Sequence, residues 1–166
     1  MDLERLTSKS KEALRSALTL ARDRNHPEAA SAHLLRALID QPDGLTMPLL
    51  QRAGVNPSDV RRRLDGVLDA LPAAYGATGE ARISDALVRT LEAALTEAQA
   101  LGDEYASTEH LVLAMLAGSD RTAGALRDAG LERDALLQAL QTIRGQQRVT
   151  SPDPESTYEA LAKYSR

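Results

Sequence analysis

Apolar residues recur every three or four positions through most of the chain, which is the spacing of one buried helix face. The pattern predicts helices over about 7–24, 31–40, 47–53 and 57–71, then a second series that ends over 132–144. The helices that begin at Ser31 and Ser107 are apolar on most of their sides, so we expect each to be buried among other helices. We expect the hydroxyl of each of these serines to cap its helix.

The series occurs twice. Leu6-Thr7 matches Ile83-Ser84 and His33 matches His110, in each case 77 positions later, and Ala53-Gly54-Val55 matches Ala129-Gly130-Leu131 at 76 positions. A repeat of about 75 residues predicts two copies of one supersecondary unit. The fold class is therefore all-α, with two pseudo-symmetric four-helix repeats packed as one compact domain. The repeats span 1–71 and 83–145, and a connector with one proline and two glycines spans 72–82.

Residues 146–166 have a different composition. The polar stretch 146–154 contains two prolines and reads as a linker. Asp153-Pro154-Glu155 has the cap, proline and acidic residue of a helix start, and Tyr158, Leu161 and Tyr164 begin an apolar stripe. Because the chain stops before this stripe is complete, we interpret it as the truncated start of a helix that continues in a longer protein.

Composition argues against several classes of function. The net charge is −4 and both Phe and Trp are absent, which disfavours nucleic acid as the main partner. There is no Cys to form a disulfide or a thiolate metal site. No apolar run is long enough to span a membrane, and the charged N-terminus lacks a signal-peptide core, so we expect a cytoplasmic protein without a membrane partner.

Few residues suggest chemistry. His33 and His110 lack a third ligand at metal-binding spacing, which favours buried or capping histidines over a metal site, and His26 has no evident role. The run 61–63 of three arginines reads as a solvated helix face, with a phosphate-binding patch as the alternative. Neither a catalytic constellation nor a Gly-rich ATP loop is present, so we expect no enzyme activity, catalytic residue or cofactor in this stretch.

The doubled repeat that begins Leu6-Thr7-Ser8-Lys9, with its two His-Leu helices and Ala-Gly turns, is similar to the Clp N-terminal domain of bacterial AAA+ unfoldases. The tail 158–164 resembles the segment that joins this domain to the first ATPase domain in ClpB-type Hsp100 disaggregases. The resemblance implies a module above a homohexameric ATPase ring that binds ATP and Mg²⁺ elsewhere. It also implies unfolded or aggregated client proteins as partners and cooperation with an Hsp70-type co-chaperone system through other domains.

The resemblance links Thr7, Asp103 and Glu109 to chaperone activity and implies a shallow apolar groove for clients. The residues by themselves offer a plainer reading. Thr7 is a helix N-cap, and acidic side chains near a helix N-terminus interact favourably with its dipole. Related domains of the ClpC type carry Glu in both copies and bind phosphoarginine, but Ala32 stands here where the second copy has Glu109, so we do not transfer that activity.

Leu20, Val88 and Leu101 lie at the edges of the apolar stripes. They either pack on the flanks of the core or line the groove between the first helices of the two repeats.

Three alternatives to the disaggregase module stay open. The first is an adaptor- or substrate-docking domain of a ClpC- or ClpA-type protease unfoldase, which the full-length sequence would distinguish. The second is a helical DNA-binding module, suggested by the arginine run at 61–63 and opposed by the net charge of −4. The third is a hydrolase, for which no nucleophile, base and orienting acid occur at recognisable spacing.

Overall fold

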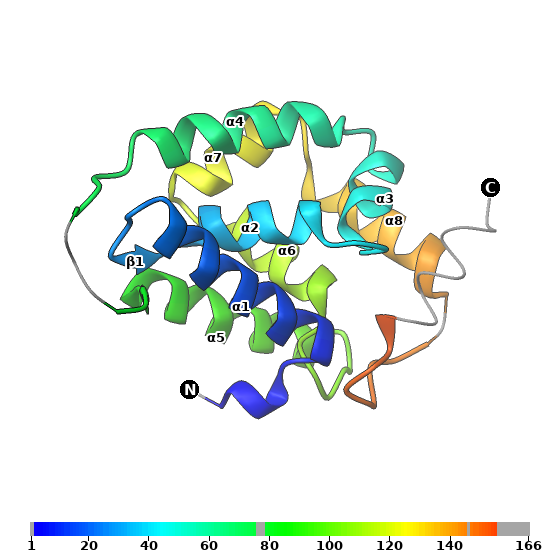
Figure 1. The fold of residues 1–166 in the computed structure, drawn as a ribbon. Coiled ribbons are helices and arrows are strands. Elements are labelled where there is room, and N and C mark those ends of the chain that lie inside the picture. The colour runs from blue at the N-terminus through cyan, green and yellow to red at the C-terminus, as the bar shows by residue number, and fades with distance from the viewer. Residues whose placement is uncertain (1, 76–78, 146, 156–166) are drawn as a thin grey trace.

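Two four-helix series follow one another along the chain (Figure 1). The computed structural model describes residues 2–75, 79–145 and 147–155. The helices of the first series are α1 (Ser8–Asp23), α2 (Ser31–Asp40), α3 (Thr46–Arg52) and α4 (Pro57–Asp69), and those of the second are α5 (Asp85–Ala100), α6 (Thr108–Ala117), α7 (Arg121–Asp128) and α8 (Arg133–Arg144). The predicted all-α class and the predicted repeat are confirmed.

The helix boundaries follow from local sequence signals. The Thr7 hydroxyl accepts a hydrogen bond from the Ser10 N–H at 3.3 Å, which confirms the predicted N-cap of α1, and the matching residue Ser84 caps α5 in the same way. The third helix of each repeat is followed by a glycine with positive φ, +84° at Gly54 and +98° at Gly130. Glycine adopts this left-handed conformation without steric cost, so both Ala-Gly turns end their helices as expected.

The predicted serine caps of the two buried helices are partly wrong. The N-cap of α2 is Ala30, and the Ser31 hydroxyl instead lies 3.2 Å from the Thr90 hydroxyl of α5. In both repeats a histidine three residues into the helix accepts a hydrogen bond from the N-cap N–H at 2.9 Å, His33 from Ala30 and His110 from Ser107. This is the half of a capping box usually made by Glu or Gln, and it confirms that both histidines are structural.

Two very short parallel strands were not predicted. β1 (Glu28–Ala29) pairs with β2 (Arg82–Ile83), and an isolated bridge joins Leu6 to Ala106. The bridge is the pseudo-symmetric counterpart of the strand pair, because both of its residues lie 77 positions from Ile83 and Ala29, respectively. Strands of two residues are too short for the alternating pattern by which sequence reveals a sheet.

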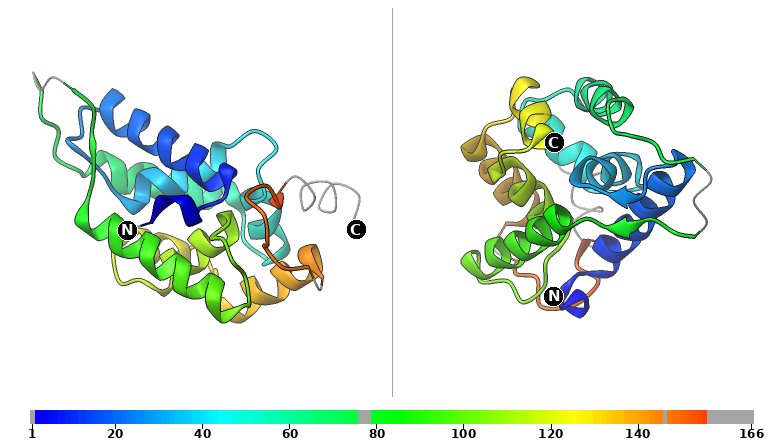
Figure 2. Two further views of the ribbon diagram at one scale, coloured as in Figure 1. Left: turned by 90° about the horizontal axis from the view of Figure 1, so that it is seen from below. Right: turned by 90° about the vertical axis from the view of Figure 1, so that its left-hand side faces the viewer.

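The two repeats are interlocked in space. Within each repeat the first helix packs on the second, α1 on α2 and α5 on α6, whereas α3 packs on α8 of the other repeat and α7 packs on α4 (Figures 1 and 2). The fully buried leucines of α2 and α6 lie in one continuous core. The third and fourth helices of each repeat therefore pack both on their own repeat and on the other one.

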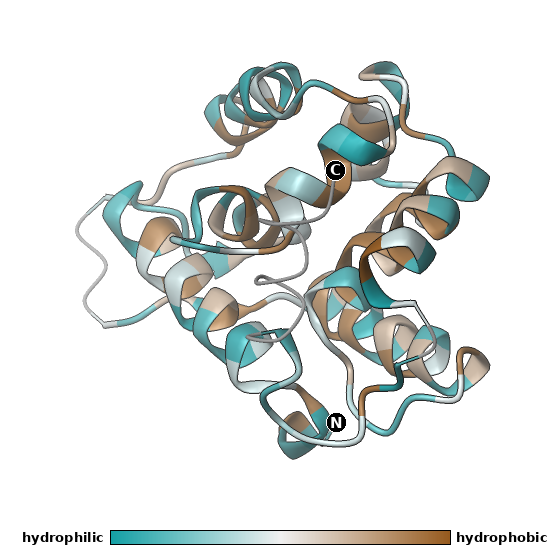
Figure 3. Cartoon of the chain, turned by 90° about the vertical axis from the view of Figure 1, so that its right-hand side faces the viewer, coloured by the Kyte–Doolittle hydropathy of each residue, from teal (hydrophilic) through white to brown (hydrophobic). Residues whose placement is uncertain are grey.

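The outer helices are amphipathic, with hydrophilic and hydrophobic residues on opposite sides (Figure 3). None of the helices in the described part of the chain is long and apolar enough to cross a membrane.

Replacing Leu35 by Ala should lower the free energy of unfolding by about 2–5 kcal/mol, because its side chain is fully buried in α2 and truncation leaves a cavity. Urea denaturation followed by circular dichroism measures this change. The matched control is Leu3→Ala, since Leu3 is 40% exposed and its truncation should cost less than about 1 kcal/mol. Equal losses in the two variants would contradict the central position of α2.

Candidate functional site

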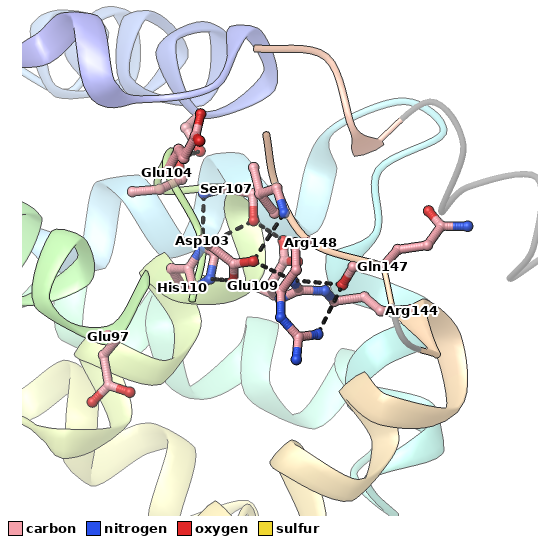
Figure 4. A network of polar contacts seen from close by, with 12 residues as sticks. Glu97, Asp103, Glu104, Ser107, Glu109, His110, Arg144, Gln147 and Arg148 are labelled. Atoms are coloured by element: carbon pink, nitrogen blue, oxygen red, sulfur yellow. Dashed lines mark hydrogen bonds and ion pairs between the residues drawn. The ribbon is translucent and has the colours of Figure 1, made fainter. Parts of the chain in front are cut away.

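A network of charged side chains lies buried in the second repeat (Figure 4). Asp103 comes from the loop before α6 and is 4% exposed, Glu109 and His110 come from the first turn of α6, and Arg144 is the last residue of α8. Buried charges are costly unless they are paired and hydrogen-bonded. Each contact of the network therefore matters for stability, because losing it leaves a buried charge without compensation.

Asp103 is the centre of this network. One carboxylate oxygen accepts hydrogen bonds from Arg144 Nη2 at 2.5 Å and from the Val149 N–H at 2.9 Å. The other oxygen lies 2.8 Å from His110 Nε2, which donates because His110 Nδ1 already accepts from the Ser107 N–H. Burial alone would raise the pKa of Asp103, but the His110, Arg144 and Val149 donors hold that pKa well below its usual range.

Glu109 contacts the same Arg144 guanidinium as Asp103. Its Oε2 lies 3.5 Å from Arg144 Nη1, and its Oε1 accepts a hydrogen bond from the Ser107 hydroxyl. Arg144 therefore bridges two buried carboxylates on two different elements, as Figure 4 shows. The arrangement joins the loop before α6 to the end of α8.

The first repeat holds a neutral counterpart of this network. His26 occupies the position that matches Asp103, and its Nδ1 lies 2.8 Å from Nε2 of His33. His26 lies in a loop as expected, but it is only 6% exposed and contacts His33, so the view that it has no role is wrong. Burial, the His26 ring and Arg24 together lower the pKa of His33 to about 4, which keeps this pair uncharged at neutral pH.

Residues 147–155 lie against the charged network. Val149 is fully buried, its N–H donates to Asp103, and its carbonyl accepts a hydrogen bond from the Glu104 N–H at 2.8 Å. Further along, the Pro152 carbonyl accepts from the Ser8 N–H of α1 at 2.8 Å. Figures 1 and 2 show this orange-red segment beside the start of α1. The polar composition of this stretch predicts a linker and gives no sign that it packs against the domain.

Glu155 is the last described residue of that segment. It is 1% exposed and in contact with the Thr7 hydroxyl. Burial and the negative charge of Glu109 raise the pKa of Glu155 to about 8. The apolar stripe predicted to follow, at Tyr158, Leu161 and Tyr164, lies outside the described residues.

The structure brings the three residues singled out by resemblance to one place. Thr7, Asp103 and Glu109 are all buried, and they contact either the segment 147–155 or the Arg144 that lies beneath it. A buried carboxylate cannot touch a client at the surface, so any effect of Asp103 or Glu109 on clients passes through the groups they hold.

Arg144 and Glu155 belong to this site but were missed. Arg144 looks like an ordinary basic residue at a helix C-terminus. Its match in the first repeat is Leu68, which is buried in the core, and an arginine in place of a buried leucine is the signal that could have found it. Glu155 offered no such signal, because it has no match in the repeat.

The three apolar candidates do not all line the cavity at the end of α8. Leu20, Val88 and Leu101 are each half-buried. Leu101 lines a cavity of about 310 Å³ at the end of α8, whereas Leu20 and Val88 do not line it. The complete lining is Leu101, Leu137, Leu140, Gln141, Arg144, Gly145 and Arg148.

The arginine run on α4 is engaged in ion pairs. Arg62 and Arg63 both contact Asp59, Arg63 at 3.1 Å, and Arg61 lies 3.4 Å from Asp40. These pairs offset much of the positive charge that a phosphate patch would need. Among the described residues, no three His, Asp or Glu side chains gather in a way that could hold a metal ion.

Comparison with known proteins finds a matching family and several similar proteins. The pattern of the family described as the Clp repeat N-terminal domain matches residues 5–129. The chaperone protein ClpB of Mycobacterium tuberculosis is 42% identical over 165 residues, covering 99% of this chain and 20% of the relative. ClpB of Bacillus cereus is 38% identical over 169 residues, again with 20% of its length covered. The chain thus spans about a fifth of the length of these curated relatives.

Solved structures share the fold. The Hsp104 N-terminal domain of Candida albicans superposes with a TM-score of 0.76 at 24% identity, covering 90% of this chain and 98% of that domain. A ClpV N-domain solved in complex with a VipB peptide superposes with a TM-score of 0.61 at 22% identity, covering 89% and 91% of the two chains.

The His26–His33 pair should make the protein sensitive to acid. The pKa of His33 is lower in the folded state, about 4, than the 6.5 of an exposed histidine, so the folded protein binds fewer protons. The contribution of His33 to the free energy of unfolding should be at its maximum above pH 6.5 and should fall by about 3 kcal/mol as the pH drops to 4. NMR titration of the His33 ring and urea denaturation at several pH values measure both quantities.

The variant His26→Asp copies the Asp–His pair of the second repeat and should raise the pKa of His33, because a carboxylate stabilises the imidazolium. The control His26→Asn keeps the site neutral and should leave the pKa of His33 low. Titration of His33 near pH 6.5 in the unchanged protein would refute this account.

Replacing Arg144 by Met should lower the free energy of unfolding by about 3–5 kcal/mol, because it leaves Asp103 and Glu109 buried without their shared cation. The control Arg133→Met removes the exposed pair with Glu97, at 2.8 Å, and should cost less than about 1 kcal/mol. Chemical denaturation compares the two.

A triple variant, Asp103→His, Glu109→Ala and Arg144→Leu, installs the uncharged residues of the first repeat at all three positions. It should recover most of the loss caused by Arg144→Met, because no unpaired charge is left buried. If it is as unstable as Arg144→Met, the cost does not come from the unpaired carboxylates.

Proposed function

Because the chain belongs to the Clp repeat N-terminal domain family, we propose that it is the substrate-recruiting N-terminal module of a ClpB-type, ATP-dependent protein disaggregase. The ClpB names of the matched relatives support this reading over a ClpC- or ClpA-type adaptor-docking domain. In this proposal the module binds unfolded polypeptide and does not itself catalyse a reaction. ATP and Mg²⁺ binding, hexamer formation and cooperation with an Hsp70-type system belong to the remaining four fifths of such a protein.

The observation that carries the binding proposal is the cavity at the end of α8. Three leucines, Leu101, Leu137 and Leu140, line it together with the arginines Arg144 and Arg148. An open, mostly apolar hollow of about 310 Å³ accommodates one or two apolar side chains of an extended segment. The exposed Arg148 at its rim favours segments that also carry acidic residues.

A chaperone gains from such a site because unfolded clients share exposed apolar side chains rather than one sequence. A small aliphatic cavity recognises the side-chain class, and weak binding lets the client pass on. The related ClpV N-domain, whose structure holds a VipB peptide, supports the idea that this fold suits peptide ligands.

Replacing Leu137 by Gln should weaken the binding of an unfolded casein about tenfold, because the cavity loses apolar contact worth about 1.4 kcal/mol. Fluorescence anisotropy gives the affinity, and NMR shifts locate the contact on α8. The matched control is Leu20→Gln, a half-buried leucine of α1 outside the cavity, which should change the affinity less than twofold. If Leu20→Gln weakens binding and Leu137→Gln does not, clients bind near α1 instead.

A further inference from the structure

The segment 147–155, which we call the strap, is held mainly through its backbone. Val149 N–H donates to Asp103 at 2.9 Å, Glu104 N–H donates to the Val149 carbonyl at 2.8 Å, and Ser8 N–H donates to the Pro152 carbonyl at 2.8 Å. Glu104 and Asp103 belong to the second repeat, whereas Ser8 begins the first helix of the first repeat. The strap therefore crosses the seam between the repeats.

The residues that hold the strap differ from their counterparts in the other repeat. The charged trio Asp103, Glu109 and Arg144 faces the strap, while the matching positions in the first repeat carry His26, Ala32 and Leu68, respectively. Val149 lies on Asp103, and Arg144 Nη2 donates to the Gln147 carbonyl at 3.1 Å. The asymmetry of the network thus coincides with the docking of the strap.

The end of the strap places a third carboxyl group against this network. Glu155 lies between the starts of α1 and α6, where α1 contributes the Thr7 hydroxyl and α6 contributes the Glu109 carboxylate and the backbone of Thr108. The nearest buried cation of the network, Arg144 on α8, already pairs with Asp103 and Glu109. Within residues 2–75, 79–145 and 147–155, no group hydrogen-bonds to the buried oxygen Oε2 of Glu155. The Thr7 hydroxyl and the backbone of Thr108 and Glu155 favour the carboxylate, but burial and the negative charge of Glu109 outweigh them.

The hydroxyl groups around Glu155 fit a neutral carboxyl group. Ser10 Oγ donates to the Ala106 carbonyl at 3.0 Å, and Thr7 Oγ1 lies 3.1 Å from Ser10 Oγ. As a carboxylate, Glu155 uses the only hydrogen of the Thr7 hydroxyl. A protonated Glu155 donates its own hydrogen to the Thr7 hydroxyl oxygen. The Thr7 hydrogen is then available to Ser10 Oγ, so that Glu155, Thr7 and Ser10 each donate one hydrogen bond.

We propose that the strap is a protonation-controlled latch, which docks while Glu155 is neutral and releases when Glu155 ionises, and that Thr7, Asp103, Glu109 and Arg144 form its receptor. Docking fixes the point at which the chain leaves the domain after residue 155. It also holds Arg148, at the start of the strap, beside the cavity at the end of α8. The receptor residues act on whatever follows the domain by holding the strap.

The direction of the pH effect follows from linkage. The pKa of Glu155 is about 8 when the strap is docked and 4.5 for a free glutamate, so the docked form binds more protons. Docking is strongest below pH 4.5, weakens about tenfold per pH unit between 4.5 and 8, and levels off above pH 8.

Amide hydrogen exchange of the whole 166-residue chain tests the latch. Protection of the Ser8, Glu104 and Val149 amides should fall on the order of 100-fold between pH 5.5 and 8.5, after correction for the intrinsic exchange rate. The Thr7 amide, which donates to the Ala106 carbonyl and not to the strap, should keep its protection and serves as the internal reference.

The variant Glu155→Gln imitates the neutral form and should retain the protection of these amides at both pH values, to within twofold. Glu104→Gln is the matched control, because the Glu104 side chain is exposed in the same loop, and it should behave like the unchanged protein. Equal protection at pH 5.5 and 8.5 in the unchanged protein, or the same loss in Glu155→Gln, would overturn the proposal.

Discussion

The buried ion pair between Asp103 and Arg144 is the contact on which the second half of this domain depends. A carboxylate removed from water needs compensation for its lost hydration, and here it receives a guanidinium, an imidazole N–H and a backbone N–H. The three donors come from α8, α6 and residue 149, and His110 of α6 lies more than 30 positions before the other two. Because losing either side-chain donor would leave a buried charge poorly paired, the network holds the end of α8 against the start of α6, and it also holds residue 149 while the strap is docked.

The two repeats show how one backbone supports two electrostatic solutions. Both cap their second helix with a histidine, His33 or His110, whose other ring nitrogen faces the residue seven positions earlier. In the first repeat that residue is His26 and the pair stays neutral, while in the second it is Asp103 and the pair recruits Arg144. The His26–His33 pair is kept neutral mainly by burial. The charged Asp103–Arg144 pair also provides a binding surface for the segment 147–155.

These different roles of the two repeats fit the recruiting module proposed above. The first repeat and the interlocked helices supply a stable body, and the surface at the end of α8 combines an apolar cavity with the docked strap. Arg144 and Arg148 border the cavity, and Arg148 also belongs to the strap, so the cavity and the docked strap share a rim. If the cavity binds clients as proposed, this shared rim couples client binding to the docking of the strap.

Local sequence signals were enough to predict the helical class, the repeat, most helix ends and the caps at Thr7 and Ser84, because periodicity and capping are local properties of the chain. It also drew attention to Asp103 and Glu109, through resemblance.

Which of these side chains come into contact follows from the packing of the helices and could not be predicted from local sequence signals. The pairing of His26 with His33, the partnership of Arg144 with two carboxylates and the burial of Glu155 join residues whose separations follow no periodic rule. The packing of α3 on α8 and of α4 on α7 is likewise one of several arrangements that the same amphipathic stripes allow. Burial then decides the chemistry, because the same carboxyl group is a solvated charge in a linker and a proton-binding group between two helix ends.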